Sequence, residues 1–138
     1  MIAMIKEEYK YSDITQRIIG CAMRVHSVLG CGFPESIYRR AMVIELKDEG
    51  LNFESEKIIL VYYKNQQIGK RRVDFLVEGV ISVEIKAISE LNDSNLNQGL
   101  NYLEAYNLEV GLLLNFGSKS LQFKRLINSR KSAKSNNH

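Results

Sequence analysis

The chain has 138 residues, of which 45% are hydrophobic and 25% charged, and its formal net charge is +3 at pH 7. This length is enough for one domain with its own core. No apolar run approaches the roughly 20 residues that a membrane span requires. The N-terminus also lacks a long apolar segment, so we expect no signal peptide and a cytoplasmic protein without membrane contact.

The positive charge is unevenly placed along the chain. Residues 129–138 contain Arg130, Lys131 and Lys134 and no acid, and without these three bases the remaining bases and acids balance. The low complexity of this tail predicts disorder. We therefore expect an N-terminal extension over residues 1–11, a domain over residues 12–128 and a disordered basic tail over residues 129–138.

Two helices are predicted first. Ser12 or Asp13 can cap a helix that Gly30 ends. Pro34 suits the first turn of a second helix over residues 35–49. Helical spacing predicts a buried face on each helix. These faces comprise Ile14, Ile18, Cys21, Ala22, Val25 and Leu29 in the first helix, and Ile37, Ala41 and Ile44 in the second.

The two cysteines and two histidines fit no zinc-binding spacing. A structural disulfide is not expected in a reducing compartment. We interpret Cys21 as a core residue, Cys31 as a loop thiol and His26 as structural rather than catalytic.

Strand-like segments follow at residues 58–63, 71–77 and 80–87, with turns at Asn65-Gln66 and Glu78-Gly79. A third helix is predicted at about residues 96–106, followed by a buried strand over residues 110–116 and a last strand over residues 121–127. The order is α-α-β-β-β-α-β-β. A helix between two strands of one sheet implies a crossover, so we predict an α/β fold with a mixed β-sheet flanked by helices.

The most informative pattern is Asp74, Glu84 and Lys86, spaced as D-x9-E-x-K across two neighbouring strands. Side chains alternate along a strand, so Glu84 and Lys86 share a face. If the two strands pair as a hairpin, Asp74 reaches the same place. Two carboxylates and an ammonium can hold a divalent metal and activate water for phosphodiester cleavage. A Glu84–Lys86 ion pair on a solvent-facing edge is the simpler alternative.

Other residues extend this pattern. Glu35 opens the second helix, where the helix dipole alone favours an acid, and Tyr38 lies one turn later. Gln98 and Tyr102 share a face of the third helix, either as substrate contacts or as a surface pair. The basic residues Lys70, Arg71 and Arg72 precede Asp74 and are candidates for nucleic-acid binding, although a charge run is usually a solvated face.

These residues together resemble the GxxExxY family, a compact branch of the PD-(D/E)xK nuclease superfamily, over about residues 12–128. The resemblance rests on Gly32-x-x-Glu35-x-x-Tyr38, Asp74, Glu84-x-Lys86, Gln98, Asn101-Tyr102-Leu103 and the segment from Gly111 to Gly117. It implies a restriction-endonuclease-like core. It also implies Asp74, Glu84 and the Ile85 carbonyl as Mg²⁺ ligands, with Lys86 acting on the attacking water or on phosphorane charge.

In the same resemblance Glu35 corresponds to a helical acid of some superfamily nucleases, and Gln98 and Tyr102 to a Q-x3-Y element. One segment departs from the family pattern, which has a histidine and an acid where this chain has Asn95 and Leu96. If that histidine serves the chemistry, the departure would remove activity.

The function expected from the sequence is a Mg²⁺-dependent nuclease that acts on DNA, in which Mn²⁺ can substitute for Mg²⁺. A homodimer that cuts both strands is one option for its assembly. The first alternative is a non-catalytic module that binds nucleic acid or protein on a nuclease fold. A hydrolase of a small phosphorylated molecule is a further alternative, and it would show little salt dependence of binding to DNA.

Overall fold

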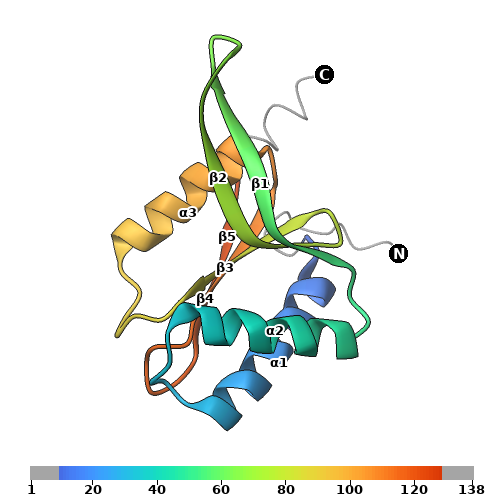
Figure 1. The fold of residues 1–138 in the computed structure, drawn as a ribbon, viewed down its shortest axis with the longest axis vertical. Coiled ribbons are helices and arrows are strands. Elements are labelled where there is room, and N and C mark those ends of the chain that lie inside the picture. Colours follow the sequence, from blue (N-terminus) through green and yellow to red (C-terminus); the bar gives the residue numbers. More distant parts are fainter. Residues whose placement is uncertain (1–9, 129–138) are drawn as a thin grey trace, which may run out of the picture.

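In the computed structural model, which describes residues 10–128, two helices precede a five-stranded sheet that is interrupted by a third helix (Figure 1). The predicted order of eight elements is confirmed. The elements are α1 (Ser12–Leu29), α2 (Glu35–Asp48), β1 (Phe53–Tyr63), β2 (Gln66–Val77), β3 (Ile81–Lys86), α3 (Asp93–Tyr106), β4 (Val110–Asn115) and β5 (Gln122–Ile127).

The sheet has the strand order β1-β2-β3-β4-β5. Strands β3 and β4 are parallel, and every other neighbouring pair is antiparallel. The parallel pair is joined through α3, because parallel neighbours cannot be connected by a tight turn. The predicted mixed sheet is therefore confirmed.

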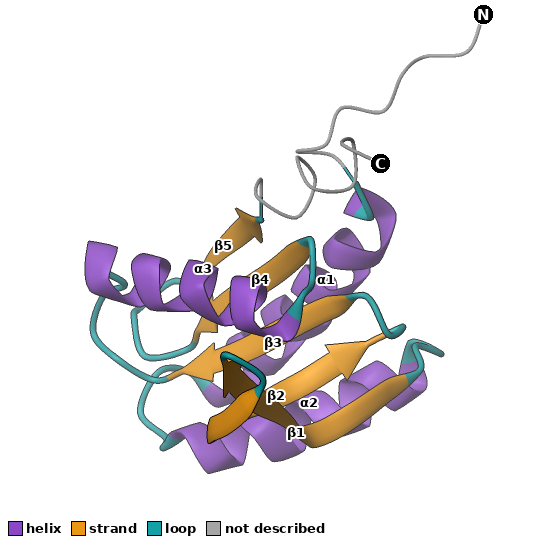
Figure 2. Ribbon diagram, turned by 90° about the horizontal axis from the view of Figure 1, so that it is seen from above, coloured by secondary structure: helices purple, strands orange, loops and turns teal. Residues whose placement is uncertain are grey.

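Helices cover both faces of the sheet. Figure 2 shows α3 on one face and α1 and α2 on the other. The larger core joins α1 and α2 to alternate residues of the strands, including Phe75, Val83, Ile85 and Leu114. A smaller cluster under α3 is formed by Leu103, Leu113 and Leu126. The side chains of β3 that do not enter the larger core, Glu84 among them, therefore point toward the face that α3 covers.

The predicted apolar face of α1 is confirmed, since Ile18, Cys21, Ala22 and Val25 are buried. The predicted face of α2 is wrong. Its buried residues are Tyr38, Met42 and Leu46, and Ile44 is 63% exposed. The second helix carries apolar residues on more than one side, so spacing alone did not identify the side that packs.

Two local predictions about caps and turns are also wrong. The residue at the start of α1 is Tyr11, which has φ 59° and no side-chain cap, so neither Ser12 nor Asp13 caps the helix. The hairpin turn is formed by Lys64 and Asn65, one residue earlier than predicted, with φ of 48° and 64°. Two consecutive left-handed residues are typical of the tight turns that suit the twist of a β-hairpin.

Strands β1 and β2 are longer than predicted and extend beyond the rest of the sheet. Their outer part, residues 58–72, projects from the body as a two-stranded ribbon (Figure 1). We call this segment the arm. Its polar residues 64–72 lack the apolar alternation that identifies a strand, which explains why the predicted strands were too short.

The described residues contain no helix long and apolar enough to cross a membrane. Cys21 is buried in the core and Cys31 is exposed after α1, as the sequence predicts. His26 uses Nε2 to donate a hydrogen bond to the Ser118 carbonyl at 2.9 Å, which is a structural contact. The predicted segments 1–9 and 129–138 lie outside the described residues, and the proposed domain division stays a prediction.

Candidate active site

Asp74 lies where β2 separates from β3. Backbone pairing of the two strands extends from Val77↔Ile81 to Phe75↔Val83 and does not continue to Asp74. Instead, Oδ2 of Asp74 accepts a hydrogen bond from the backbone N–H of Ile85 at 2.7 Å. The Asp74 carboxylate thus accepts a hydrogen bond from a backbone N–H of β3 that pairing with β2 leaves without a partner. Only 8% of Asp74 is exposed.

The other carboxylate oxygen of Asp74 contacts helix α2. Arg39 donates a hydrogen bond from Nε to Oδ1 at 2.8 Å, with both side chains mostly buried. A second guanidinium nitrogen of Arg39 lies 3.8 Å from Oε1 of Glu56 in β1. Nothing in the sequence motif singles out Arg39, and its role emerges only when α2 is packed beside the strand.

Glu84 is the second acid of the site and is half-buried. Burial raises the pKa of its carboxyl to about 8, the negative charge of Asp74 adds to the rise, and the ammonium of Lys86 opposes it. Among the described residues, Oε1 of Glu84 has no hydrogen-bond partner. A side-chain hydrogen bond to Asp74 also raises the pKa of Glu84, so the metal-free pair of acids holds a proton that a bound cation would replace.

Glu35 and Tyr38 lie in the first turns of α2. The charge of Glu35 also raises the pKa of Glu84, which locates this acid near the site. Tyr38 is buried and stacks on Phe116 with ring centroids 4.7 Å apart. Its hydroxyl donates to the Gly30 carbonyl and accepts from the backbone N–H of Phe33, at 2.5 and 3.2 Å. Tyr38 therefore holds the loop before α2 in place, while Glu35 faces the acids.

Helix α3 brings aromatic residues to the same region. Gln98 is exposed, and Tyr102 lies one turn later with the guanidinium of Arg71 4.8 Å from its ring centre. Tyr106 is buried, its hydroxyl has no partner among the described residues, and burial together with the charge of Glu84 raises its pKa. Sequence reasoning missed Tyr106, although its i, i+4 spacing from Tyr102 was a usable signal.

The structure separates the three basic residues of the motif. Arg71 packs over Tyr102, whereas Arg72 lies 3.7 Å from Oε1 of Glu56. Lys70 is exposed. Neighbouring residues of a strand point to opposite sides, so the triplet is not one continuous basic surface.

The two positions that depart from the family pattern have structural roles here. Asn95 and Asn92 form reciprocal side-chain to backbone hydrogen bonds of 2.9 and 3.0 Å at the start of α3. This capping box begins the helix three residues earlier than predicted. Leu96 packs against the smaller core.

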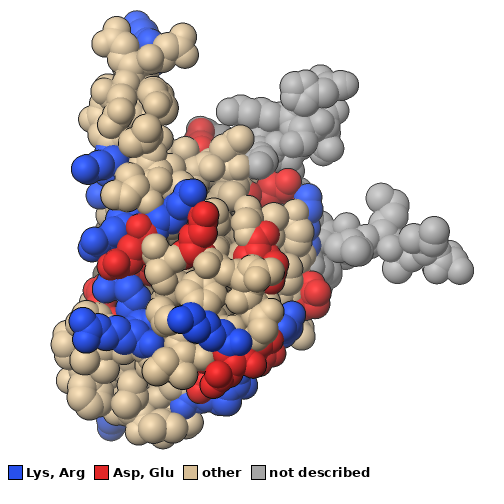
Figure 3. Space-filling view, turned by 45° about the vertical axis from the view of Figure 1, so that its right-hand side comes forward, with Lys and Arg blue, Asp and Glu red and all other residues tan. Residues whose placement is uncertain are grey.

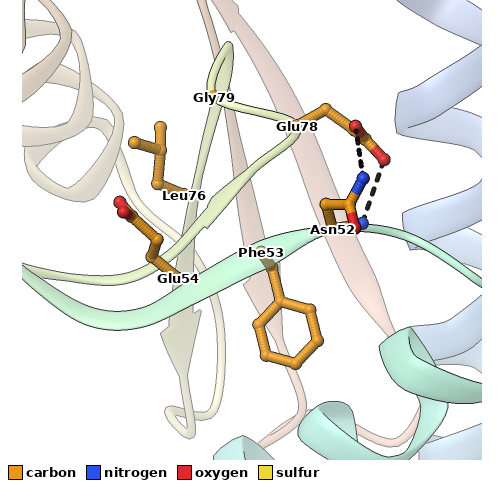
Figure 4. Close-up of a pocket in the computed structure, with 6 residues that line it drawn as sticks. All are labelled: Asn52, Phe53, Glu54, Leu76, Glu78 and Gly79. Atoms are coloured by element: carbon orange, nitrogen blue, oxygen red, sulfur yellow. Dashed lines mark hydrogen bonds between the residues drawn. The ribbon is translucent and has the colours of Figure 1, made fainter.

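Figure 4 shows a pocket at the opposite end of β2 from the arm. Glu78 accepts hydrogen bonds there from the backbone and side chain of Asn52, and Glu54 and Leu76 lie side by side. None of the candidate site residues lines it; its residues are Asn52, Phe53, Glu54, Leu76, Glu78 and Gly79. A polar hollow beside Asp74 is lined by Ser36, Arg39, Arg40, Val43, Ser55 and Glu56.

The site thus holds a buried acid, a half-buried acid, a lysine and surrounding groups that can contact phosphate. No group of three or more Asp, Glu, His or Cys residues within residues 10–128 forms a metal cage. The carboxylates of Asp74 and Glu84 interact, and two carboxylates alone supply fewer oxygens than a metal ion coordinates. Such an incomplete oxygen shell suits Mg²⁺, which keeps several waters.

Comparisons with known proteins agree with this fold. A crystal structure of the protein SSO0001 superposes with a TM-score of 0.54 at 16% identity, covering 94% of this chain and 68% of that one. No curated protein matches the chain. The family model described as the PD-(D/E)XK nuclease superfamily matches residues 12–126. The chain therefore belongs to the PD-(D/E)XK nuclease superfamily.

Proposed function

We propose that this protein is a Mg²⁺-dependent nuclease that hydrolyses DNA phosphodiester bonds at Asp74 and Glu84, and that it is a member of the GxxExxY branch. The observation that carries the proposal is the half-buried Glu84 side chain, whose Oε1 atom is buried without a donor among the described residues and which lies beside a second acid. Two acids beside one lysine leave one negative charge without a partner. This arrangement suits a bound cation better than it suits a structural ion pair.

In this proposal, Asp74, Glu84 and the Ile85 carbonyl hold the ion, and Lys86 orients the attacking water or stabilises charge on the phosphate. When bound, Mg²⁺ supplies Lewis acidity and lowers the pKa of water, and Mn²⁺ can replace it. Glu35 positions water on the side of α2, and Gln98 and Tyr102 contact the substrate on the side of α3. Lys70, Arg71 and Arg72 bind phosphates.

A single site cuts one strand, so cleavage of both strands requires two copies of the chain. We therefore propose that the protein cuts both strands as a homodimer, whereas a monomer would nick one strand. Product analysis on supercoiled plasmid separates these two modes, because a nicked circle and a linear product migrate differently.

The test combines metal titration with cleavage. Calorimetric titration of Mg²⁺ and Mn²⁺ into the wild type, Glu84→Ala and the control Glu54→Ala is run beside plasmid nicking on the same samples. Glu54 is an exposed acid of β1 that lines the pocket of Figure 4, which neither Asp74 nor Glu84 lines. Metal binding and nicking that are lost only in Glu84→Ala would support the proposal, and a folded wild type without either would refute it.

A second function is favoured by one observation. Both oxygens of Asp74 already accept protein hydrogen bonds, from Arg39 and from Ile85. A site satisfied in this way could belong to a non-catalytic module that binds nucleic acid or protein. Such a module predicts DNA binding that is independent of Mg²⁺ and no cleavage under any metal.

A further inference from the structure

The arm carries an unusual combination of charge and exposed apolar surface. Residues 58–72 contain Lys64, Lys70, Arg71 and Arg72 and no acid. Figure 3 shows Lys and Arg along this projection and at its tip, whereas acids lie on the adjoining body. The arm alone therefore carries more positive charge than the net charge of the whole chain.

The same segment leaves large apolar side chains in solvent. Ile58, Leu60, Tyr62, Tyr63 and Ile68 are between 41% and 66% exposed. A group of exposed apolar side chains of this kind is typical of a surface that binds another molecule. The backbone register slips between Val61 and Tyr62, and such an irregularity increases the local twist of a ribbon.

We propose that the arm enters the major groove of double-stranded DNA, with its tip reading base edges and its base leading the duplex to Asp74. This inference rests on the proposed nuclease function and specifies its substrate as duplex DNA. The B-DNA major groove is about 12 Å wide and admits a two-stranded β-ribbon.

Features of the arm tip fit binding in the major groove of duplex DNA. Lys64, Asn65, Gln66 and Gln67 are exposed and supply both hydrogen-bond donors and acceptors. Amide side chains of this type form paired hydrogen bonds with adenine in the major groove. The exposed rings of Tyr62 and Tyr63 can pack on sugars or on thymine methyl groups.

The arm also lies on the same strand as the candidate metal ligand. From Asp74 to Gln66 the chain is a continuous strand. At about 3.3 Å per residue this strand spans roughly 26 Å, which corresponds to about 8 base pairs of duplex. One bound duplex can therefore contact the tip and the acids together.

A second copy of the chain is a less suitable occupant. A symmetric contact between two arms would bring two acid-free basic segments together, and like charges at an interface oppose association. The polyanionic backbone of DNA instead complements this charge. Association of the chain through the arm remains an outcome that the experiment detects.

The experiment measures binding of the full chain to a labelled duplex about two helical turns long and to its single strand, by fluorescence anisotropy in EDTA. The arm-tip variant is Lys64→Ala with Gln67→Ala. The matched control is Lys47→Ala with Gln16→Ala. These two exposed residues belong to α2 and α1, the helices that cover the face of the sheet opposite α3. Sedimentation, thermal unfolding and Mn²⁺ titration are measured on the same samples.

We expect the wild type to prefer the duplex, and the tip variant to bind it at least about tenfold more weakly with a salt slope reduced by about 1. The control should bind like the wild type, and unfolding and Mn²⁺ binding should not change in either variant.

Unchanged duplex binding in the tip variant would overturn the inference, as would a wild type that prefers single strands or binds neither. A dimer that the tip variant converts to monomers, with duplex binding intact, would assign the arm to self-association. Loss of Mn²⁺ binding in every sample would instead reject the proposed metal site while leaving the arm result interpretable.

Discussion

At the scale of single residues, Glu84 determines how the site responds to pH. Its carboxyl has a pKa of about 8 in the folded protein against 4.5 as the ordinary value. Burial is the main cause, so the folded state holds a proton that the unfolded chain releases more readily. The Glu84 carboxyl is therefore largely protonated at neutral pH in the metal-free protein.

This pKa predicts lower stability of the metal-free protein in mild alkali. The contribution of Glu84 is complete below its unfolded pKa of 4.5 and is lost as pH rises toward about 8, because ionised Glu84 is buried beside Asp74. Melting temperatures of the wild type should fall across this window, whereas those of Glu84→Gln should fall less. Parallel melting curves for the two proteins would contradict the burial of Glu84.

Arg39 is predicted to compete with the metal. Its guanidinium is bonded to Oδ1 of Asp74 at 2.8 Å and places a positive charge beside the proposed cation site. Arg39→Gln should therefore raise Mn²⁺ affinity several-fold, measured by calorimetry, while lowering the free energy of unfolding by about 1–3 kcal/mol. The control Arg40→Gln changes an exposed neighbour on the same helix. Weaker Mn²⁺ binding in Arg39→Gln would show that the arginine orients Asp74 for the metal instead.

At the scale of elements, the ends of β3 and β4 are held by Asn115. Its side chain accepts from the backbone N–H groups of Ile88 and Gly117 and donates to the Ile88 carbonyl, at 3.0–3.1 Å. Phe116 also donates its backbone N–H to the Lys86 carbonyl at 2.9 Å. The segment that follows Lys86 is thus fixed by the segment that follows β4.

Gly117 allows this close approach and is predicted to be essential for the fold. A Cβ there would lie 2.3–2.5 Å from backbone atoms of Ala87 and Ile88, so Gly117→Ala must displace the chain directly after Lys86. We expect a loss of about 3 kcal/mol or more in the free energy of unfolding, measured in urea, because backbone atoms cannot rotate away. Gly32→Ala is the control, since nothing lies within 4 Å of its Cβ position. Equal stability of the two variants would show that this contact is less tight than the structure indicates.

The sequence predicted the elements better than their packing. Apolar periodicity identified α1, a continuous apolar run identified β4, and the crossover rule predicted the parallel strand pair. The buried side of α2 was predicted wrongly, because Ile37 and Ile44 are as apolar as Met42 and Leu46. The arm was underestimated because its strands carry no buried face, and such a ribbon has little apolar alternation to detect.

In the candidate site, too, residues on neighbouring strands were easier to predict than residues that packing of the helices brings to the site. Asp74, Glu84 and Lys86 could be grouped from strand alternation, since their positions on neighbouring strands are a local property. Arg39 reaches the site through the tertiary packing of α2, which the sequence motif does not encode. Tyr106 was missed although it lies one helical turn after Tyr102. The separation of Arg71 from Arg72 likewise follows from which side of the strand meets Tyr102.

At the scale of the whole molecule, charge and core are divided between different parts. The described body buries its apolar residues in two clusters, one on each face of the sheet. The arm contributes little to either cluster and carries the acid-free basic segment. A fold organised in this way can change its arm with little effect on the core, whereas the proposed metal site depends on α2, β2 and β3 together.

This dependence predicts that metal binding stabilises the whole protein. The proposed ligands Asp74 and Glu84 come from β2 and β3, whose backbone pairing ends at Phe75↔Val83, so an ion would join the two strands where they separate. Saturating Mn²⁺ at about 100 times its dissociation constant should raise the free energy of unfolding by about 2.7 kcal/mol, measured as a shift in urea midpoint. Glu84→Gln should lose most of this gain, while Glu54→Gln, an exposed acid on β1, should keep it. An equal gain in Glu84→Gln would mean that Mn²⁺ stabilises the fold from another site and that the two acids are not its ligands.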